Sequence, residues 1–374
     1  MSQTFSTLVL GAQAERQVSL DNRLVIAPMC QYSAEEGQAN DWHLSHWINL
    51  LNSGAAMVIL EATAVTREGR ISPGCLGIWD DATAEALEHH LKRARAQAPA
   101  VPVCIQLAHA GRKGGSAAPW LGGAQLPLDA GGWEALAPSA IPHAEGELPP
   151  KAMSEQEIEA TIQAFVDAAK RAQDMGIDAI ELHAAHGYLM HEFLSPLSNQ
   201  RSDSYGGDFE GRTRFVRETF ERVRAVFKGP LGFRVSATDW AEGGWTPEET
   251  IALAQALKDA GADFAHISTA GVSVAQKIPA APGFQLPFAQ QVKQATGLTT
   301  IGVGLITEAE QVEEALVQGQ CDLVAVARAV LFNPRWPWEV AAKLGGQVAA
   351  SPPYLRALPA RAKHIFGQPR MGMR

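Results

Sequence analysis

The sequence predicts an α/β protein that folds as a (β/α)8 TIM barrel in a single domain. Eight short apolar runs, rich in β-branched residues, alternate with stretches long enough to hold a helix. Strands of a parallel sheet are buried on both faces and so read as nearly continuous apolar runs, and eight of them alternating with helices indicate a closed barrel. The expected strands, in chain order, are Leu24–Met29, Met57–Glu61, Val101–Ala108, Ala179–His183, Leu231–Val235, Phe264–Ser268, Thr299–Val303 and Leu323–Ala327.

The segments between these runs carry helix-start signals. A hydroxyl residue three positions before a carboxylate forms a capping box, in which each side chain bonds the other residue's backbone N–H. The expected boxes are Ser154 with Glu157, Thr246 with Glu249 and Thr307 with Glu310. A doubly wound sheet is the alternative fold, but no GxGxxG follows the first strand, where such folds carry their glycine-rich turn.

One connection is much longer than the others. Residues 111–150, after the third strand, are dense in Gly, Pro and Ala. This length exceeds an ordinary connection, so we expect a loop excursion over the active site. The barrel domain is expected to span residues 1–345, and residues 346–374 to form a C-terminal tail at an oligomer interface.

Composition excludes several classes of protein. The chain has 374 residues, 46% of them hydrophobic, and a net charge of -9, which argues against nucleic acid or an anionic membrane as a partner. Its apolar runs fall short of the roughly 20 residues of a membrane-spanning helix. The start of the chain lacks the pattern of a secretory signal. The four cysteines have no CxxC spacing, which is typical of reduced thiols in a cytoplasmic protein.

Functional residues of such barrels stand at the carboxyl ends of strands. At the end of the fourth strand, His183 and His186 converge if the chain turns after His183, and Gly187 makes that turn plausible. Neutral imidazoles can bind a metal or donate hydrogen bonds to an anionic oxygen. We expect no metal, because no carboxylate follows at ligand spacing and Glu181 should point away from the neighbours of His183. The plain alternative is a pair of histidines satisfied within a loop.

Other strand ends predict an anion site. Gly304 and Arg328 follow the seventh and eighth strands, where barrels frequently hold a phosphate. Arg234 lies on an apolar strand and needs a partner, because an unpaired buried charge is very costly. A structural ion pair would satisfy Arg234 equally well. Together, however, Arg234 and a phosphate site across the same mouth indicate an anionic cofactor with a ring.

Several ordered motifs resemble one family over nearly the whole chain. They are Asp21-Asn22-Arg23, Ala27-Pro28-Met29-Cys30-Gln31-Tyr32, Gln106-Leu-Ala-His109-Ala-Gly111-Arg112-Lys113, the segment with His183, His186 and Tyr188, and Ser195-Pro-Leu-Ser-Asn199-Gln-Arg201-Ser-Asp203-Ser-Tyr205-Gly206-Gly207. They resemble the old yellow enzyme family of FMN-dependent ene-reductases. Cys30 and Tyr32 are similar to its thermophilic-like subclass, which includes the xenobiotic reductases.

The resemblance implies FMN at the barrel mouth. Arg234 would sit by the flavin N1 and C2 carbonyl, where negative charge accumulates on reduction. Gln106 and Ala62 would meet the ring edge, and Cys30, near N5, would tune the potential. The remaining residues implied to bind the cofactor are Ala27, Pro28 and Met29 along the ring and Gly304, Ala327 and Arg328 at the phosphate.

The resemblance also implies a reaction. His183 and His186 would donate to the carbonyl oxygen of an α,β-unsaturated substrate, and Tyr188 would give a proton to the α-carbon after hydride transfer to the β-carbon. Tyr32 would touch the substrate. Reduced nicotinamide, NADPH or NADH, would use the same pocket first, giving ping-pong kinetics. Nitro compounds and quinones are further candidate substrates.

The tail and two departures complete these expectations. In the thermophilic-like subclass a tail lends an arginine across a dimer, and Arg356 matches it, which implies a homodimer or a dimer-based homo-oligomer. The family usually has Gly at Ala327 and commonly Asn at Gly211, so we expect a looser loop near Gly211. The alternatives are another FMN barrel, of the dihydroorotate or 2-hydroxyacid type, and a noncatalytic flavoprotein.

Overall fold

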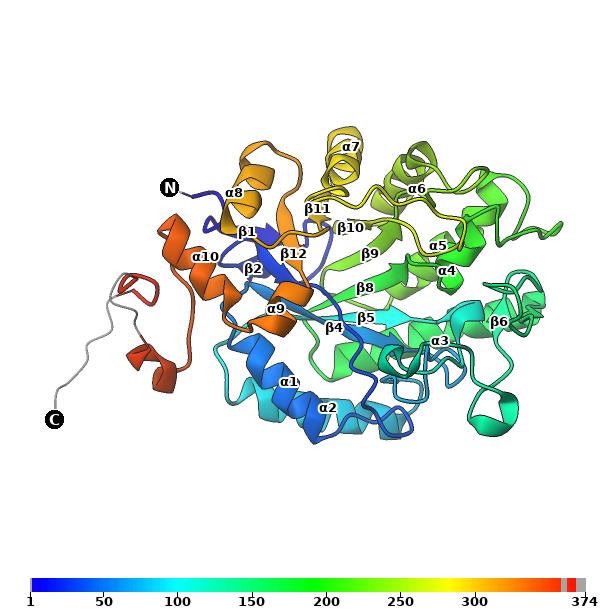
Figure 1. Cartoon of the computed structure of the whole chain (residues 1–374), viewed down its shortest axis with the longest axis horizontal. Helices are drawn as coiled ribbons and strands as arrows, with labels where there is room; N and C mark the ends of the chain where they lie inside the picture. The colour runs from blue at the N-terminus through cyan, green and yellow to red at the C-terminus, as the bar shows by residue number, and fades with distance from the viewer. Residues whose placement is uncertain (1, 358–361, 368–374) are drawn as a thin grey trace.

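A closed barrel of eight parallel strands forms the centre of the protein (Figure 1). The structure is a computed structural model that describes residues 2–357 and 362–367. The predicted (β/α)8 fold is confirmed, and neighbouring strands follow one another around the barrel in chain order. The barrel strands are β3 (Leu24–Ile26), β4 (Met57–Ala64), β5 (Val103–Ala108), β8 (Ala179–Ala184), β9 (Leu231–Ser236), β10 (Phe264–Ser268), β11 (Thr299–Gly302) and β12 (Leu323–Val326).

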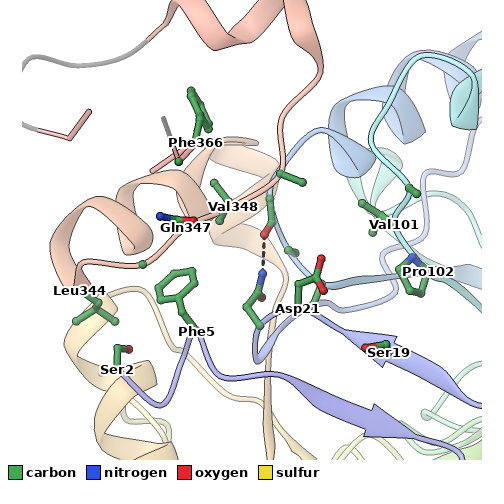
Figure 2. Close-up of a pocket in the computed structure, with 18 of the residues that line it drawn as sticks. Ser2, Phe5, Ser19, Asp21, Val101, Pro102, Leu344, Gln347, Val348 and Phe366 are labelled. Atoms are coloured by element: carbon green, nitrogen blue, oxygen red, sulfur yellow. Dashed lines mark hydrogen bonds between the residues drawn. The ribbon is translucent and has the colours of Figure 1, made fainter. Parts of the chain in front are cut away.

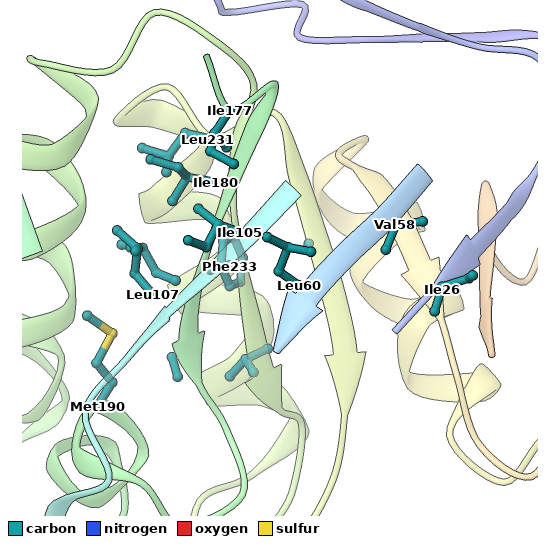
Figure 3. Packing of buried hydrophobic residues seen from close by; sticks show 14 of the residues in the cluster. Ile26, Val58, Leu60, Ile105, Leu107, Ile177, Ile180, Met190, Leu231 and Phe233 are labelled. Carbon is teal, nitrogen blue, oxygen red and sulfur yellow. The ribbon is translucent and has the colours of Figure 1, made fainter. Parts of the chain in front are cut away.

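Helices surround the barrel and pack on its outer face. They are α1 (Asp41–Leu51), α2 (Asp81–Arg95), α3 (Glu155–Asp174), α4 (Leu189–Leu194), α5 (Phe209–Arg224), α6 (Pro247–Asp259), α7 (Leu286–Thr296), α8 (Ala309–Val317), α9 (Arg328–Phe332) and α10 (Trp336–Leu344). Outward residues of the strands, such as Ile105, Ile180 and Phe233, form the main core with them (Figure 3). No helix in the described part of the chain is long and apolar enough to cross a bilayer.

Two of the three expected capping boxes are present. Ser154 and Glu157 exchange hydrogen bonds at the start of α3, and Thr246 and Glu249 do so at the start of α6. The third is wrong, because α8 is capped by Glu308, whose backbone N–H donates to the side chain of Gln311 at 3.0 Å. Glu308 and Gln311 thus take the role that we expected for Thr307 and Glu310, one residue earlier.

Strand ends differ from the sequence expectation where the backbone chemistry changes. We expected the first strand to reach Met29, but β3 stops at Ile26. Pro28 has no N–H with which to continue a ladder. In contrast, β4 continues to Ala64, and a bulge between Leu60 and Ala62 shifts its register on β5. The bulge inserts Glu61 at the barrel mouth.

A hairpin that we did not predict covers the amino end of the barrel. Strands β1 (Leu8–Leu10) and β2 (Val18–Leu20) pair in antiparallel register. Leu10 and Leu20 pack against the inward residues Ile59, Cys104 and Ile301, among others. The lower half of the barrel interior is therefore apolar and filled, which leaves the carboxyl ends for a site.

Residues 111–150 form the expected excursion after β5. It contains three 3-10 turns, η1 (Gly111–Lys113), η2 (Pro119–Leu121) and η3 (Leu128–Ala130). It returns through β6 (Leu136–Ala137), which pairs with β7 (Lys151–Ala152) just before α3. In Figure 1 this segment lies at the end of the barrel opposite α10.

The described residues of the tail, 346–357 and 362–367, fold back on their own chain. Val348 and Ile365 pack with Ala341 of α10, and a 3-10 turn, η4 (Pro352–Arg356), lies between them. A cavity of about 610 Å³ separates this tail from the amino ends of the strands (Figure 2). Within it, Asn22 donates to the backbone oxygen of Gly54 at 3.0 Å, so its amide is already bonded. The proposed boundary between barrel and tail remains a prediction.

Candidate active site

The histidine pair stands on a sharp turn at the carboxyl end of β8. The strand ends at Ala184, and His186 and Gly187 adopt positive φ angles of 61° and 73°. A Cβ at Gly187 would lie 2.1 Å from the backbone oxygen of Gly271, so this position requires glycine. The turn brings the rings of His183 and His186 together, with centroids 5.2 Å apart.

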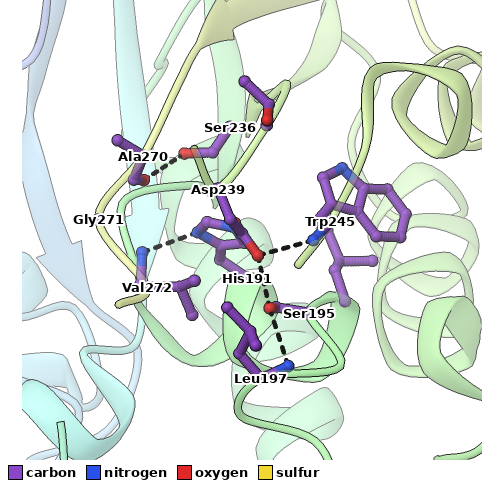
Figure 4. A network of polar contacts seen from close by, with 12 residues as sticks. His191, Ser195, Leu197, Ser236, Asp239, Trp245, Ala270, Gly271 and Val272 are labelled. Carbon is purple, nitrogen blue, oxygen red and sulfur yellow. Dashed lines mark hydrogen bonds and ion pairs between the residues drawn. The ribbon is translucent and has the colours of Figure 1, made fainter. Parts of the chain in front are cut away.

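A buried polar network fixes this turn from below (Figure 4). The backbone N–H of Gly187 donates to Nδ1 of His191 at 2.8 Å, and Nε2 of His191 therefore donates to Asp239 at 2.8 Å. Asp239 also accepts from the Ser195 hydroxyl at 2.6 Å and from the backbone N–H of Trp245 at 2.7 Å. Burial opposes ionisation of Asp239, but His191 and these donors outweigh it and lower its pKa.

The two active-site histidines offer different edges to a ligand. Nδ1 of His183 accepts from the backbone N–H of Ala185 at 3.3 Å, so in the neutral ring the proton is on Nε2, which can donate. Nε2 of His186 is already engaged with the Ser268 hydroxyl at 2.7 Å, which leaves its Nδ1 edge. Burial, followed by the charge of Arg234, lowers the pKa of both rings well below 6.5. Both are neutral at physiological pH.

Tyr188 follows the turn and packs against the first histidine. Its ring centroid lies 5.0 Å from that of His183, and burial raises its pKa well above the usual value, so its hydroxyl keeps its proton. Tyr188 and Ala62 line the same small cavity of about 10 Å³. The structure thus brings together residues predicted from β4 and β8.

Lys113, which we quoted in a motif without assigning a role, stands beside Tyr188. Its Nζ lies 5.1 Å from the centroid of the Tyr188 ring and donates to the backbone oxygens of His186 at 2.9 Å and Gly271 at 3.2 Å. Burial lowers its pKa to about 8. Its place directly after β5 was the available signal, but sequence alone does not show that η1 turns it toward the histidines.

The floor of the mouth is polar and incompletely satisfied. Gln106, Glu181, Arg234 and His266 lie on neighbouring strands, and cross-strand register places Gln106 beside Glu181 and Arg234 beside His266. Nε of Arg234 and Nε2 of His266 are buried without a hydrogen-bond partner among the described residues. Our expectation that Glu181 points away is wrong: residues two apart on a strand share a face, so Glu181 enters the barrel as His183 does. Among the described residues, no group of three His, Cys, Asp or Glu side chains could hold a metal.

The loop after β3 forms one side of the mouth. Glu61 accepts from the backbone N–H of Gln31 at 2.9 Å, which ties this loop to the bulge in β4. Cys30 is a free thiol whose pKa burial raises well above its usual value, so it stays protonated. Tyr32 has a φ of 52°, and its ring meets Trp120 of the excursion edge-on at 5.6 Å. The remaining predicted residues of this loop are Ala27, Pro28 and Met29, of which Ala27 is buried.

The predicted phosphate residues stand at the ends of neighbouring strands. Gly304 has a φ of 130°, and a Cβ there would lie 2.9 Å from Nε2 of Gln285, so its backbone is closely packed and requires glycine. Ala327 precedes α9, and Arg328 is its first residue and is exposed. Because β11 and β12 pair directly, both ends open on the same part of the mouth.

Two predicted features lie elsewhere. Arg356 ends η4 and is exposed, in a turn whose Tyr354 packs on Trp338 of α10. The expectation of a looser loop near Gly211 is wrong. A Cβ at Gly211 would lie 2.0 Å from the backbone oxygen of Gly206, so glycine allows a close approach that a larger residue would prevent.

Comparisons with known proteins agree on one class of enzyme. The model of the NADH:flavin oxidoreductase / NADH oxidase family matches residues 15–347. The chain is 42% identical to the NADPH dehydrogenase of Geobacillus sp. (strain WCH70), covering 94% of this chain and 98% of that one. It is 41% identical to the NADPH dehydrogenase of Listeria innocua, covering 96% and 99%.

Solved structures give the same fold. Morphinone reductase in complex with tetrahydroNAD superposes with a TM-score of 0.74 and 25% identity, covering 99% of this chain and all of that one. A 2-naphthoyl-CoA reductase has a TM-score of 0.80 at 24% identity, with 91% of this chain and 52% of that chain covered. The second likeness bears on the fold alone.

Proposed function

The chain belongs to the NADH:flavin oxidoreductase / NADH oxidase family, and from that premise we propose that it reduces the activated C=C bond of α,β-unsaturated carbonyl compounds with NAD(P)H. The observation that carries this proposal is the pair of neutral histidines beside a protonated tyrosine. They meet at one mouth, where the ring centroid of His183 lies 5.2 Å from that of His186 and 5.0 Å from that of Tyr188. Neutral donors next to an acid suit a substrate oxygen that gains negative charge during reaction.

The mouth fits FMN as the flavin. Arg234 offers a buried N–H without a partner among the described residues, as expected for a group that bonds a ligand. Gly304 and Arg328, on adjacent strand ends, suit the phosphate. Ala327 links β12 to Arg328, and its backbone N–H suits the same group. Gln106 and Ala62, which are in register on β5 and β4, suit the ring edge. When bound, FMN accepts and returns a hydride.

The side chains then have separate tasks. The Nε2–H of His183 and the Nδ1–H of His186 bind the carbonyl oxygen and polarise the double bond; in this tautomer of His186, Nε2 accepts from the Ser268 hydroxyl. Tyr188 gives a proton to the α-carbon, and the positive charge of Arg234 favours the tyrosinate that results. Cys30 stays a neutral thiol that contributes a weak hydrogen bond and is no nucleophile. Tyr32, with Trp120, forms a wall against the substrate.

One pocket serves both the reductant and the substrate, which gives ping-pong kinetics. The relatives named NADPH dehydrogenase support NADPH as reductant. Dihydroorotate-type and 2-hydroxyacid-type enzymes need a base at the substrate carbon, whereas the two histidines and Tyr188 are arranged as donors.

Phenols test the role of the histidines, because a phenolate mimics the enolate formed in the reaction. Added to the oxidised flavoprotein, a phenol should produce a long-wavelength charge-transfer band. The His183→Ala, His186→Ala double variant should lose that band while keeping its flavin. If the band survives in the double variant, or is absent from the unaltered protein, the histidines do not bind the substrate oxygen.

We also propose a homodimer, or an oligomer built from dimers, in which Arg356 reaches the neighbour's substrate pocket. Its support is an exposed guanidinium on a proline-stiffened turn, η4. Arg356→Ala should change the affinity for bulky substrates. Mixing it with Tyr188→Phe should give heterodimers that each have one intact site, whereas a fully active monomer in sedimentation would contradict the proposal.

A further inference from the structure

A carboxylate in the barrel interior has no task in the proposed reaction. Glu181 lies on β8 and is fully buried, between Gln106 on β5 and His266 on β10. A buried carboxylate is costly unless it is paired and hydrogen-bonded. Its presence directly below the histidine turn therefore needs a physical explanation.

Both oxygens of Glu181 are used as acceptors. Nε2 of Gln106 donates to Oε1 at 2.7 Å, and Nδ1 of His266 lies 2.8 Å from Oε2. Since Nε2 of Gln106 is the donor, the amide turns its NH2 toward Glu181 and its carbonyl oxygen away from it. Burial, and then Arg234, lower the pKa of His266, so its ring is neutral and donates through Nδ1.

Arg234 completes the set. It is in register with His183 on one side and His266 on the other, and it is buried. Burial lowers the pKa of Arg234, and the negative charge of Glu181 acts in the opposite direction. Because His183 and His266 are neutral, the charges of Glu181 and Arg234 cancel, and the floor of the mouth has no net charge.

We propose that Glu181 is a positioning residue for the flavin, which offsets the charge of Arg234 and fixes the Gln106 amide with its carbonyl oxygen turned away from Glu181. This inference rests on the proposed function, which sets the ring against Arg234 and Gln106. Arg234 alone would strongly favour the electron-rich reduced ring. The negative charge of Glu181 weakens that preference, so the reduced flavin can still transfer its hydride to a substrate.

The test is the relative affinity of the protein for reduced and oxidised FMN, measured as the midpoint potential of the bound flavin. Glu181→Gln keeps the shape of the side chain and removes its charge. The ratio of the affinities for reduced and oxidised FMN should shift at least tenfold toward reduced FMN. For this two-electron couple, such a shift raises the midpoint potential by about 30 mV. A purely structural role would change stability and leave the potential unmoved.

Glu192→Gln is the matched control. Glu192 on α4 is equally buried, accepts from the backbone N–H of Arg112 at 2.9 Å, and has its pKa raised to about 8 by burial. At neutral pH this substitution therefore introduces the same amide without removing a charge. Its potential should match that of the unaltered protein.

An unchanged ratio in folded, flavin-loaded Glu181→Gln would overturn the inference, and so would equal shifts in both variants. If Glu181→Gln alone does not fold, the Glu181→Gln, His266→Gln double variant supplies an amide partner and should give the same shift; an unchanged ratio there would also overturn it. Failure of the proposed function is distinguishable, since the unaltered protein would then bind no flavin or reduce no enone.

Discussion

Two buried carboxylate–histidine pairs invite comparison. Asp239 with His191 and Glu181 with His266 are each 2.8 Å apart, and all four side chains are fully buried. Around Asp239, donors from Ser195 and the Trp245 backbone, together with Gly187 on His191, satisfy the network (Figure 4). Around Glu181, the polar atoms continue to His266 Nε2 and Arg234 Nε, which have no partner among the described residues.

The network of Asp239, His191 and Ser195, called the brace below, stabilises the fold, whereas the network of Glu181 can bind a ligand. A network that uses all its hydrogen bonds internally stabilises one conformation, here the turn that carries His186. A network that ends on buried polar groups without partners can still form hydrogen bonds to a ligand. The same pair of residue types therefore serves stability in one place and cofactor binding in the other.

The largest expected effect is on the brace. Asp239→Asn turns an NH2 group toward buried donors, so at least two charge-assisted hydrogen bonds worth about 1.5–3 kcal/mol each are lost. The free energy of unfolding should therefore fall by about 3–5 kcal/mol, with or without flavin, as measured by urea denaturation. The control is Asp167→Asn, which removes an exposed pair with Lys170 and should cost less than about 1 kcal/mol. Equal costs for the two substitutions would show that Asp239 is no brace.

Arg234→Met should act mainly on the flavin. Losing a charge-assisted hydrogen bond worth about 1.5–3 kcal/mol should weaken FMN about tenfold to a hundredfold. Riboflavin, which lacks the phosphate, should weaken by the same factor, because Arg234 is assigned to the ring. Fluorescence titration of the apoprotein measures both. Unchanged riboflavin affinity would remove Arg234 from the ring site.

Acid should lower the stability of the protein through His183 and His186, which stand on the turn that the brace holds. Burial lowers the pKa of His183 and His186 well below the 6.5 of the unfolded chain, so below that pH the unfolded state binds more protons. Their contribution to stability is complete above 6.5 and falls as pH decreases, by at most about 1.4 kcal/mol per pH unit for each ring. The His183→Gln, His186→Gln double variant should flatten this loss between pH 7 and about pH 5. An identical pH profile would mean that the folded rings titrate normally.

The smallest effect is expected at the exposed phosphate residue. Arg328→Ala should weaken FMN about fivefold, near 1 kcal/mol, and leave riboflavin unchanged, the opposite pattern to Arg234→Met. Dialysis followed by titration compares the two ligands. Full retention of FMN affinity by the variant would contradict the assignment of Arg328.

These regions also show what the sequence can predict. Each barrel strand is a local apolar run, so all eight were found, and Gly187 favoured the turn on which the convergence of His183 and His186 depends. The pairing of Glu181 with Gln106 and His266 depends on register across four strands, β5, β8, β9 and β10, which no local pattern encodes. Alternation along β8 alone, however, already contradicted our statement that Glu181 points away.

Other misses have local physical causes. The hairpin of β1 and β2 has three-residue strands, too short for a clear alternation. The cap of α8 uses Glu308 with Gln311, a pair without a hydroxyl. Lys113 reaches Tyr188 through the 3-10 turn η1 after β5, and Trp120 meets Tyr32 only through the fold of the excursion. Tertiary placement decides each of these.

The most direct test of the account is to time the two half-reactions separately, without air, in the unaltered protein and in Tyr188→Phe. NADPH should bleach the flavin at nearly the same rate in both, because reduction of the flavin needs no proton from Tyr188. An enone should then restore the colour of the unaltered protein, and do so more slowly in the variant by about a hundredfold or more. The account would be contradicted if the enone fails to reoxidise the unaltered protein, or if the substitution slows both steps equally.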